Sequence, residues 1–259
     1  MNKISKTGRY LIIFVSVLIH THSYCQQVST VVIESGKYIP LYGNDTSLVV
    51  VNDFKMDVYP VTNTQYLSFV FKNPEWQKSL VKRLFADENY LQTWDNDSTL
   101  GRNISPMSPV TNISWFAAKE YCKCKGKRLP TVDEWEYVAM AGQNKRDGRE
   151  DNIFNQYILS WYEAPKTYDK EIGNTFKNIW GVYDLHGLVW EWTLNFNSIL
   201  ITGESRGDAD VDKNLFCASG AVGATDLMNY AAFMRYAFRG SLKANYAIKN
   251  LGFRCVKDI

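Results

Sequence analysis

The residues best suited to chemistry in this chain are its cysteines, because a thiolate can bind a metal, attack a substrate or close a disulfide. The sequence has five cysteines, and Cys25 lies in a segment with the pattern of an export signal. Beyond it stand Cys122, Cys124, Cys217 and Cys255. Cys122 and Cys124 form a Cys-x-Cys pair that could act as a metal clip, and soft thiolates favour Cu(I). Export also permits disulfides, and the sequence does not choose among the three pairings that four cysteines allow.

Histidine narrows the chemistry further. His20 and His22 leave with the export signal, so His186 alone remains. One imidazole cannot build a three-histidine site for iron or zinc. The sequence also offers no convincing Ser-His-Asp set and no Gly-rich phosphate loop. We therefore interpret His186 as a turn residue with a hydrogen-bonded ring rather than as a catalytic base.

The pattern of residues 1–25 predicts export. Basic residues precede an apolar run over 11–19, and Ser23 and Cys25 suit cleavage before Gln26. A lipid anchor on Cys25 is a weaker alternative, because the residues before it do not fit the usual pattern. The apolar run is short for a membrane span, and no other stretch is apolar enough to cross a bilayer. We therefore expect a periplasmic or secreted protein with no membrane span after signal removal.

Composition favours one globular domain over residues 26–259. Removing residues 1–25 takes away three basic and no acidic residues, which leaves 26 basic and 27 acidic side chains. No nucleic-acid partner is expected, because proteins that bind nucleic acid need a clustered basic surface. The many Trp and Tyr residues indicate a loop-rich fold held by large aromatic side chains.

Two short segments echo each other and predict two helices that follow strand ends. The sequence Pro-Val-Thr-Asn occurs at 60–63 and again at 109–112. Apolar residues at helical spacing follow each, and Ser114 can cap the second helix. These residues are Tyr66, Phe69 and Val70 after the first segment, and Ala118, Tyr121 and Cys122 after the second. Residues 30–60 alternate as strands do, and the polar segment 73–105 predicts a surface insertion.

A third helix is predicted after Thr131, which can form a capping box with Glu134. Its buried stripe would be Trp135, Val138 and Ala139. Its acidic pair Asp133 and Glu136 is interpreted as helix-surface charge. Residues 143–160 are charged and predict a loop, and beyond them we expect short strands and long loops.

Three blocks of the sequence resemble the formylglycine-generating enzymes, also called sulfatase-modifying factors. They are Gly126–Tyr137 (GKRLPTVDEWEY), Gly181–Trp192 (GVYDLHGLVWEW) and Asn250–Cys255 (NLGFRC). The resemblance extends over residues 31–255. It implies an α+β fold of the C-type-lectin-like kind, loop-rich, with a small mixed sheet and about three helices.

The resemblance also implies where an active site would lie. The enzymes of this family bind copper and attack substrate with two cysteines, and the equivalent positions here are Asp226 and Ala231. Because neither is a thiol, the chain is similar to the NirV-type variant encoded beside copper nitrite reductases. A ligand cleft would be walled by Trp190, Asp226, Tyr230 and Arg235. Asp226 and Arg235 could equally serve as structural residues.

For the cysteines, the resemblance pairs Cys122 with Cys255 in a disulfide. Cys124 and Cys217 are then left as a second bridge, as candidate catalytic thiols, or as candidate copper ligands. Simple disulfides or buried thiols are the more general interpretation.

The loop of the second block would bind calcium in this family. The implied ligands are the side chains of Asp184 and Glu191 and the carbonyls of Gly187 and Val189. This set suits calcium, which takes several hard oxygen ligands. In the alternative interpretation, Asp184 caps the turn and Glu191 pairs with a buried arginine.

Three functions follow from these features. We expect first an exported accessory protein that binds a small ligand or a protein or peptide partner, linked to the maturation of a periplasmic copper nitrite reductase. One alternative is an oxidase that converts a sulfatase cysteine to formylglycine with relocated thiols. The other is a lectin-like adhesion module. Calcium is the expected cofactor and copper a second candidate.

Overall fold

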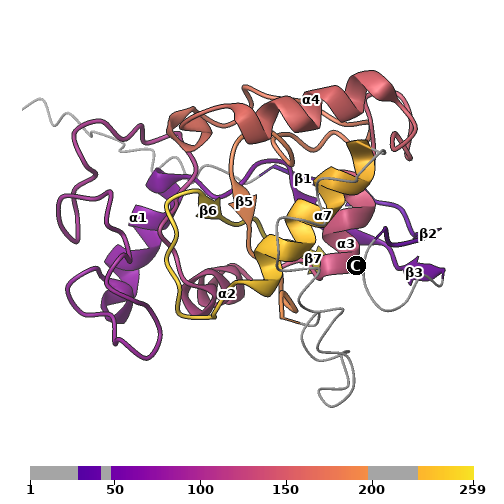
Figure 1. Cartoon of the computed structure of the whole chain (residues 1–259). Helices are drawn as coiled ribbons and strands as arrows, with labels where there is room; N and C mark the ends of the chain where they lie inside the picture. Colours follow the sequence, from indigo (N-terminus) through magenta and orange to yellow (C-terminus); the bar gives the residue numbers. More distant parts are fainter. Residues whose placement is uncertain (1–28, 42–47, 198–226) are drawn as a thin grey trace, which may run out of the picture.

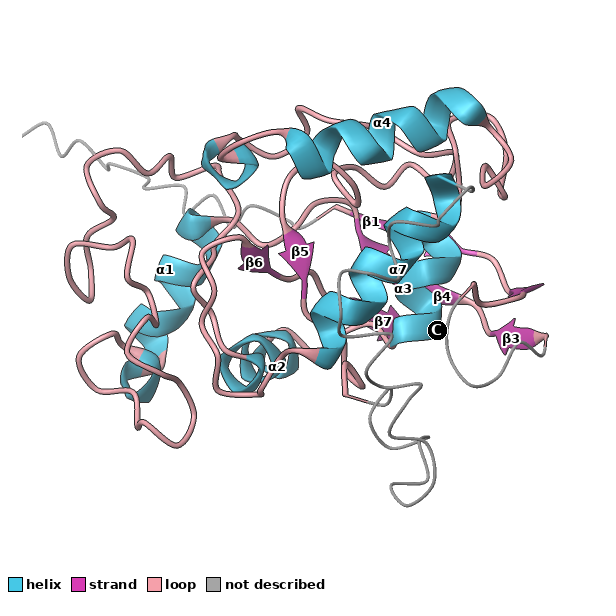
Figure 2. Ribbon diagram, in the orientation of Figure 1, coloured by secondary structure: helices cyan, strands magenta, loops and turns pink. Residues whose placement is uncertain are grey.

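The computed structural model describes residues 29–41, 48–197 and 227–259. Five α-helices lie in this part of the chain, together with short strands and long loops (Figures 1 and 2). The helices are α1 (Asn63–Lys72), α2 (Trp115–Cys124), α3 (Val132–Ala139), α4 (Asn152–Glu163) and α7 (Leu227–Gly240), with the 3-10 turns η1 (Pro74–Trp76) and η2 (Thr167–Asp169). The strands are β1 (Thr30–Ile33), β2 (Gly36–Tyr38), β3 (Val49–Val51), β4 (Phe54–Asp57), β5 (Trp190–Glu191), β6 (Leu251–Gly252) and β7 (Val256–Asp258).

The strands form three small sheets of mixed direction. β1, β4 and β7 make an antiparallel sheet in that order, and β2 pairs antiparallel with β3. β5 and β6 run parallel, with Trp190 opposite Leu251. The expected α+β, loop-rich fold with small mixed sheets is confirmed, but five α-helices in the described residues replace the three that we expected.

The three helices predicted from apolar spacing and caps form where expected. Ser114 caps α2, and Thr131 with Glu134 closes the capping box of α3. Thr62 caps α1 in the same way, with Gln65 as its partner. The two echoing segments also pair with each other, since Val110 N donates to Val61 O at 2.8 Å. The echo therefore marks two segments that meet in an isolated bridge between Thr62 and Pro109, each leading into a helix, whereas no strand of the described chain directly precedes the second one.

Residues 73–105 lie mostly at the surface, as their polar composition predicts, but a few buried side chains anchor the segment to the core. Trp76, Tyr90 and Trp94 are buried within the largest core cluster. The hydroxyls of Tyr66 and Tyr90 lie 2.7 Å apart, and Trp94 Nε1 donates to Asn63 Oδ1 at 2.9 Å. The scattered aromatic side chains thus fold back on α1, with their polar tips hydrogen-bonded as burial requires.

Two further predictions were wrong in the second half of the chain. Residues 152–163 form α4 within the segment that we expected to be a loop, and α7 stands where short strands were expected. Phe154, Ile158 and Trp161 supply a buried stripe at helical spacing, and Asp151 caps the helix. Because the residues before Asp151 are charged, the sequence indicated a loop there instead of this helix.

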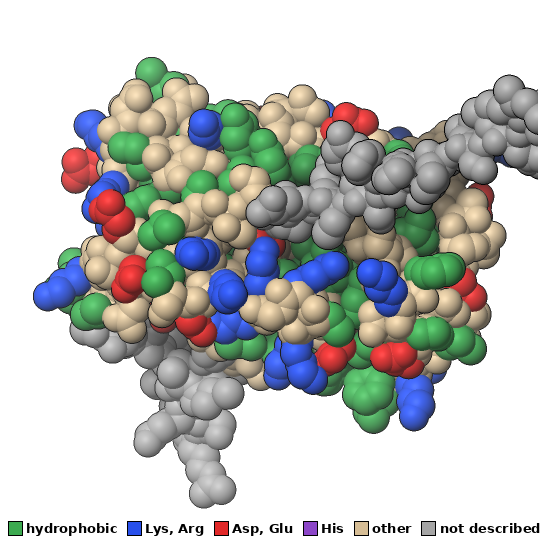
Figure 3. All heavy atoms as spheres, turned by 180° about the vertical axis from the view of Figure 1, so that it is seen from behind, with side chains coloured by type: hydrophobic (Ala, Val, Ile, Leu, Met, Phe, Trp, Pro, Cys, Tyr) green, Lys and Arg blue, Asp and Glu red, His purple; other side chains and the backbone are tan. Residues whose placement is uncertain are grey.

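Charged side chains cover much of the surface. Figure 3 shows Lys and Arg side chains across the middle of one face, with acidic and hydrophobic side chains between them. Ion pairs join several of these charges across elements, such as Lys127 with Asp57 at the end of β4. No helix in the described ranges is long and apolar enough to cross a membrane.

The expected disulfide between Cys122 and Cys255 is present and ties α2 to the segment before β7. It joins residues 133 positions apart. A cross-link of that span constrains the unfolded chain strongly, by about 5 kcal/mol in the chain-entropy account.

We predict that the double variant Cys122→Ser/Cys255→Ser loses about 5 kcal/mol of unfolding free energy, because the unfolded chain regains the entropy that the bridge removes. Urea unfolding at one pH and temperature measures this loss. Cys124→Ser keeps the bridge and serves as the matched control. An equal loss in the control, or less than about 1 kcal/mol in the double variant, would contradict the prediction.

Candidate functional site

Ala231, which the resemblance places at one of the two cysteine positions of the oxidases, is buried in this structure. Ala231 lies in α7, is 1% exposed and packs in a cluster with Phe154 and Ile158 of α4. Its carbonyl accepts a hydrogen bond from the Tyr162 hydroxyl at 3.2 Å. Asp226, at the first position, lies outside the described residues. Position 231 therefore serves the contact between α4 and α7.

Beside this contact lies a group of four aromatic side chains that we call the ring platform: Trp161, Tyr162, Trp190 and Phe238. Trp190 of β5 stacks on Phe238 with ring centres 4.6 Å apart. Its ring centre lies 5.1 Å from Trp161 and 5.4 Å from Tyr162. Three of the four are half-buried, as is Tyr230, the predicted neighbour of Trp190 in the cleft. Sequence reasoning missed Trp161 and Tyr162 because it took their helix for a loop.

Arg235, predicted as a cleft residue, points into the protein. Its side chain is 4% exposed, and its Nη2 lies 2.8 Å from Glu136 Oε2. Arg239 binds the same carboxylate, with Nη1 at 2.6 Å from Oε1. Both guanidinium groups also lie over the ring of Trp135. Of the two interpretations of Arg235, the geometry favours the structural one.

Glu136 is accordingly not the surface charge that we predicted. Its side chain is only 20% exposed and receives both guanidinium groups. Burial alone would raise the pKa of Glu136, but Arg235 and Arg239 outweigh it and lower the pKa to about 2. One carboxylate facing two cations leaves a net positive charge between α3 and α7.

Glu191 and Arg254 form a fully buried ion pair. Both side chains are 0% exposed, and Arg254 Nη2 lies 2.8 Å from Glu191 Oε1. Arg254 Nε bridges both carboxylate oxygens, and Trp135 Nε1 donates to Oε2 at 2.8 Å. The alternative interpretation of Glu191, pairing with a buried arginine, is what the structure contains.

Asp184 caps its turn in the way that the same alternative describes. Its backbone has φ of 62°, and one carboxylate oxygen accepts hydrogen bonds from Thr175 N and Oγ1. The other oxygen accepts from Gly173 N at 2.6 Å. Three protein donors thus hold this buried carboxylate.

The expected calcium site stays a prediction, and its four ligands are not equally free. The carbonyls of Gly187 and Val189 accept no hydrogen bond from the described residues. Both carboxylates, in contrast, are already bonded to protein donors, and Glu191 could reach an ion only by leaving Arg254. The side-chain half of the set therefore does not fit calcium in this arrangement.

His186 is a buried structural residue, as we interpreted it. Its Nε2 lies 2.9 Å from the carbonyl of Ala139, so the neutral ring donates there. Trp135 and Phe154 enclose the ring edge to face. Burial, followed by the charge of Arg235, lowers the pKa of His186 to about 4. A base enclosed in this way has no access to a substrate.

The remaining thiols do not form a visible site. Cys124 is exposed at the end of α2 and bonds to none of the described cysteines. Burial and the carboxylate of Glu120 raise the pKa of its thiol, which lowers the thiolate fraction at neutral pH. Cys122 is in the disulfide, so the Cys-x-Cys clip is not available. Cys217 lies outside the described residues, and the described part holds no group of three or more His, Cys, Asp or Glu suited to a metal.

Comparisons with known proteins identify the family of this chain. The family profile described as "Sulfatase-modifying factor enzyme 1-like domain" matches residues 18–259. The chain therefore belongs to the sulfatase-modifying factor family, as its three sequence blocks predicted.

Individual relatives divide between active and inactive names. The chain is 29% identical to "Inactive C-alpha-formylglycine-generating enzyme 2" of Bos taurus over 80% of this chain and 78% of that protein. It is equally 29% identical to "Formylglycine-generating enzyme" of Bos taurus, over 81% of this chain and 67% of that protein. Among solved structures, PvdO from Pseudomonas aeruginosa aligns with 17% identity and a TM-score of 0.47 over 89% of this chain and 94% of its own.

We predict that Glu191→Gln costs about 3 to 5 kcal/mol of unfolding free energy, because it leaves the buried Arg254 charge uncompensated. Urea unfolding measures the cost. Glu120→Gln is the matched control, since Glu120 forms only a surface pair with Lys123 and its loss should cost less than about 1 kcal/mol. A neutral Glu191→Gln would show that the pair does not hold the fold together.

The free energy of unfolding should fall as pH drops from 6.5 to 4, because unfolded His186 takes up a proton there and folded His186 does not. His186 contributes about 3 kcal/mol to this fall, from a pKa near 4 in the folded state and 6.5 in the unfolded state. Above pH 6.5 the imidazole is neutral in both the folded and the unfolded state, so this loss of stability is absent.

The check is the difference between the wild-type protein and His186→Gln, whose amide can still donate to Ala139 O but does not titrate. Urea unfolding of both across this pH range gives that difference. Parallel curves for the two proteins would refute the prediction.

Proposed function

We propose that this protein is an exported member of its family that binds a ligand or a protein partner instead of oxidising cysteine, and that it serves the maturation of a periplasmic copper nitrite reductase. The observation that best supports this proposal is the buried alanine at position 231. The oxidases need a thiol there, and this chain has a buried methyl group held between α4 and α7.

Copper chemistry fits this arrangement poorly. Two thiolates select Cu(I), and neither Asp226 nor Ala231 carries sulfur. Among the described residues, the cysteine with a free thiol is Cys124. It is exposed on α2 and its thiol has a raised pKa. The equal identity to active and inactive relatives leaves the choice to these residues.

The ring platform supports the binding part of the proposal. Trp190 and Phe238 stack at 4.6 Å, and the ring of Tyr162 lies beside them with its hydroxyl bonded to the Ala231 carbonyl. Half-buried aromatic groups are typical of surfaces that hold peptides and partner proteins. The buried pairing of Arg235 and Arg239 with Glu136 supports the platform from below by fixing α7 on α3.

Two parts of the proposal, export and the link to a copper nitrite reductase, are supported by the sequence rather than by the geometry. The signal pattern of residues 1–25 supports export, and the disulfide agrees with an oxidising compartment. The similarity to NirV-type proteins supports the link to a copper nitrite reductase.

The deciding experiment incubates the purified protein with Cu(I), oxygen and a cysteine-containing sulfatase peptide, followed by mass spectrometry of the peptide. We expect no formylglycine, because the second thiol of the oxidase pair is replaced by Ala231. A family member with both cysteines serves as the positive control under the same conditions.

Aldehyde formation by this chain would overturn the proposal. The variants Cys124→Ser and Cys217→Ser would then identify relocated thiols as its source. A peptide that stays unmodified while the positive control converts it would support the binding function.

A further inference from the structure

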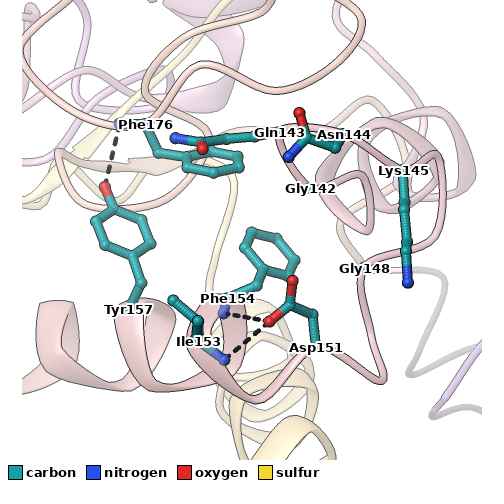
Figure 4. Close-up of a pocket in the computed structure, with 10 residues that line it drawn as sticks. All are labelled: Gly142, Gln143, Asn144, Lys145, Gly148, Asp151, Ile153, Phe154, Tyr157 and Phe176. Carbon is teal, nitrogen blue, oxygen red and sulfur yellow. Dashed lines mark hydrogen bonds between the residues drawn. The ribbon is translucent and has the colours of Figure 1, made fainter.

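A cavity of about 360 Å³ opens between α4 and the loop that follows α3 (Figure 4). One wall is the turn 142–145 together with Phe176, and the other is the first part of α4 with the cap residue Asp151. The cavity is separate from the ring platform, although Phe154 lies both in its lining and in the cluster around Ala231.

The walls have a fixed shape. Gly142 N donates to Lys145 O at 2.9 Å, which closes the turn of the first wall. Gly148 allows this loop to approach α4 closely, since a Cβ there would lie 3.0 Å from the Phe154 ring and from Gly142 N. Tyr157 fixes the position of Phe176, whose backbone N donates to the Tyr157 hydroxyl at 3.2 Å. The cavity is therefore built before any ligand arrives.

The floor is aromatic and the rim is polar. The rings of Phe154 and Phe176 have their centres 5.2 Å apart and are tilted by 35°. In Figure 4, the Asn144 amide and the Asp151 carboxylate come from opposite walls and face the space between them. The side chains of Gln143, Asn144 and Lys145 carry no hydrogen bond or ion pair to any described residue.

The rim charges exclude simple ions as the ligand. Asp151 Oδ1 already accepts from the backbone N–H groups of Ile153 and Phe154, so the helix end that could bind an anion is occupied by a carboxylate. Lys145 opposes a bare cation in the same cavity. The other Asp151 oxygen stays free to accept from a hydroxyl, and the two carboxamides can donate and accept.

From this chemistry we infer that the cavity binds a neutral saccharide ring of about monosaccharide size. The apolar C–H face of such a ring would lie on Phe176, the partly exposed ring of the pair, and its hydroxyls would bond to Asn144, Gln143 and Asp151. The inference goes beyond the proposed function and stands without it. The site also works without calcium, because its hydrogen-bonding groups are side chains of the protein.

The test is saturation-transfer NMR with the full-length purified protein and a panel of methyl glycosides of glucose, galactose, mannose and N-acetylglucosamine. We expect transfer from at least one glycoside, unchanged by EDTA and strongest at ring C–H protons. Free phenylalanine is included, since a zwitterion with an aromatic side chain is the competing occupant of a cavity with one cation and one anion.

Two variants locate the binding. Asn144→Ala removes an exposed amide, and Asp151→Asn keeps a helix cap while replacing the free carboxylate oxygen. Each should weaken glycoside binding at least five-fold. Asn103→Ala, an exposed asparagine on another loop, is the matched control and should leave binding unchanged. Thermal unfolding of each variant confirms its fold.

Absence of transfer from every glycoside would overturn the inference. Binding that neither variant weakens, or binding of phenylalanine alone, would also overturn it.

Discussion

The buried contact between Glu191 and Arg254 is the constraint on which the rest of the structure depends. Arg254 also donates to the carbonyls of Asp57, Val58 and Tyr183, so one guanidinium joins β4, the loop before β5 and the segment before β7. Trp135 adds α3 through its indole N–H. Two opposite charges in an interior gain from such full hydrogen bonding and lose heavily when either is alone. Every element that carries a candidate site residue is fixed, directly or through one neighbour, by this contact.

Local sequence chemistry predicted much of the fold correctly. The caps of α1, α2 and α3 form because a Thr or Ser side chain accepts from the first free backbone N–H groups, which requires only neighbouring residues. The buried aromatic contacts of segment 73–105 could not be predicted in this way. They depend on partners outside the segment, such as Asn63 for Trp94, and polar composition does not reveal such contacts.

The candidate site was only partly predictable for the same reason. The sequence named Trp190 and Ala231, which both contact Tyr162, and offered the pairing of Glu191 with an arginine. It could not show that Glu136 receives Arg235 and Arg239, because 99 residues separate Glu136 from Arg235. It also assigned most of α4 to a loop and so missed Trp161 and Tyr162, which this helix brings to Trp190. Charge and polarity along the chain indicate exposure only when distant partners are absent.

Residues 251–258 contact several parts of the interior, and their late position in the chain determines when that interior can fold. Phe253 packs edge to face on Tyr66 and Tyr121, Arg254 neutralises Glu191, and Cys255 holds α2. These residues follow all other described core segments along the chain, so the interior cannot close before they have been synthesised. The core therefore forms only once this segment has left the ribosome and can join the sheets and helices that it contacts.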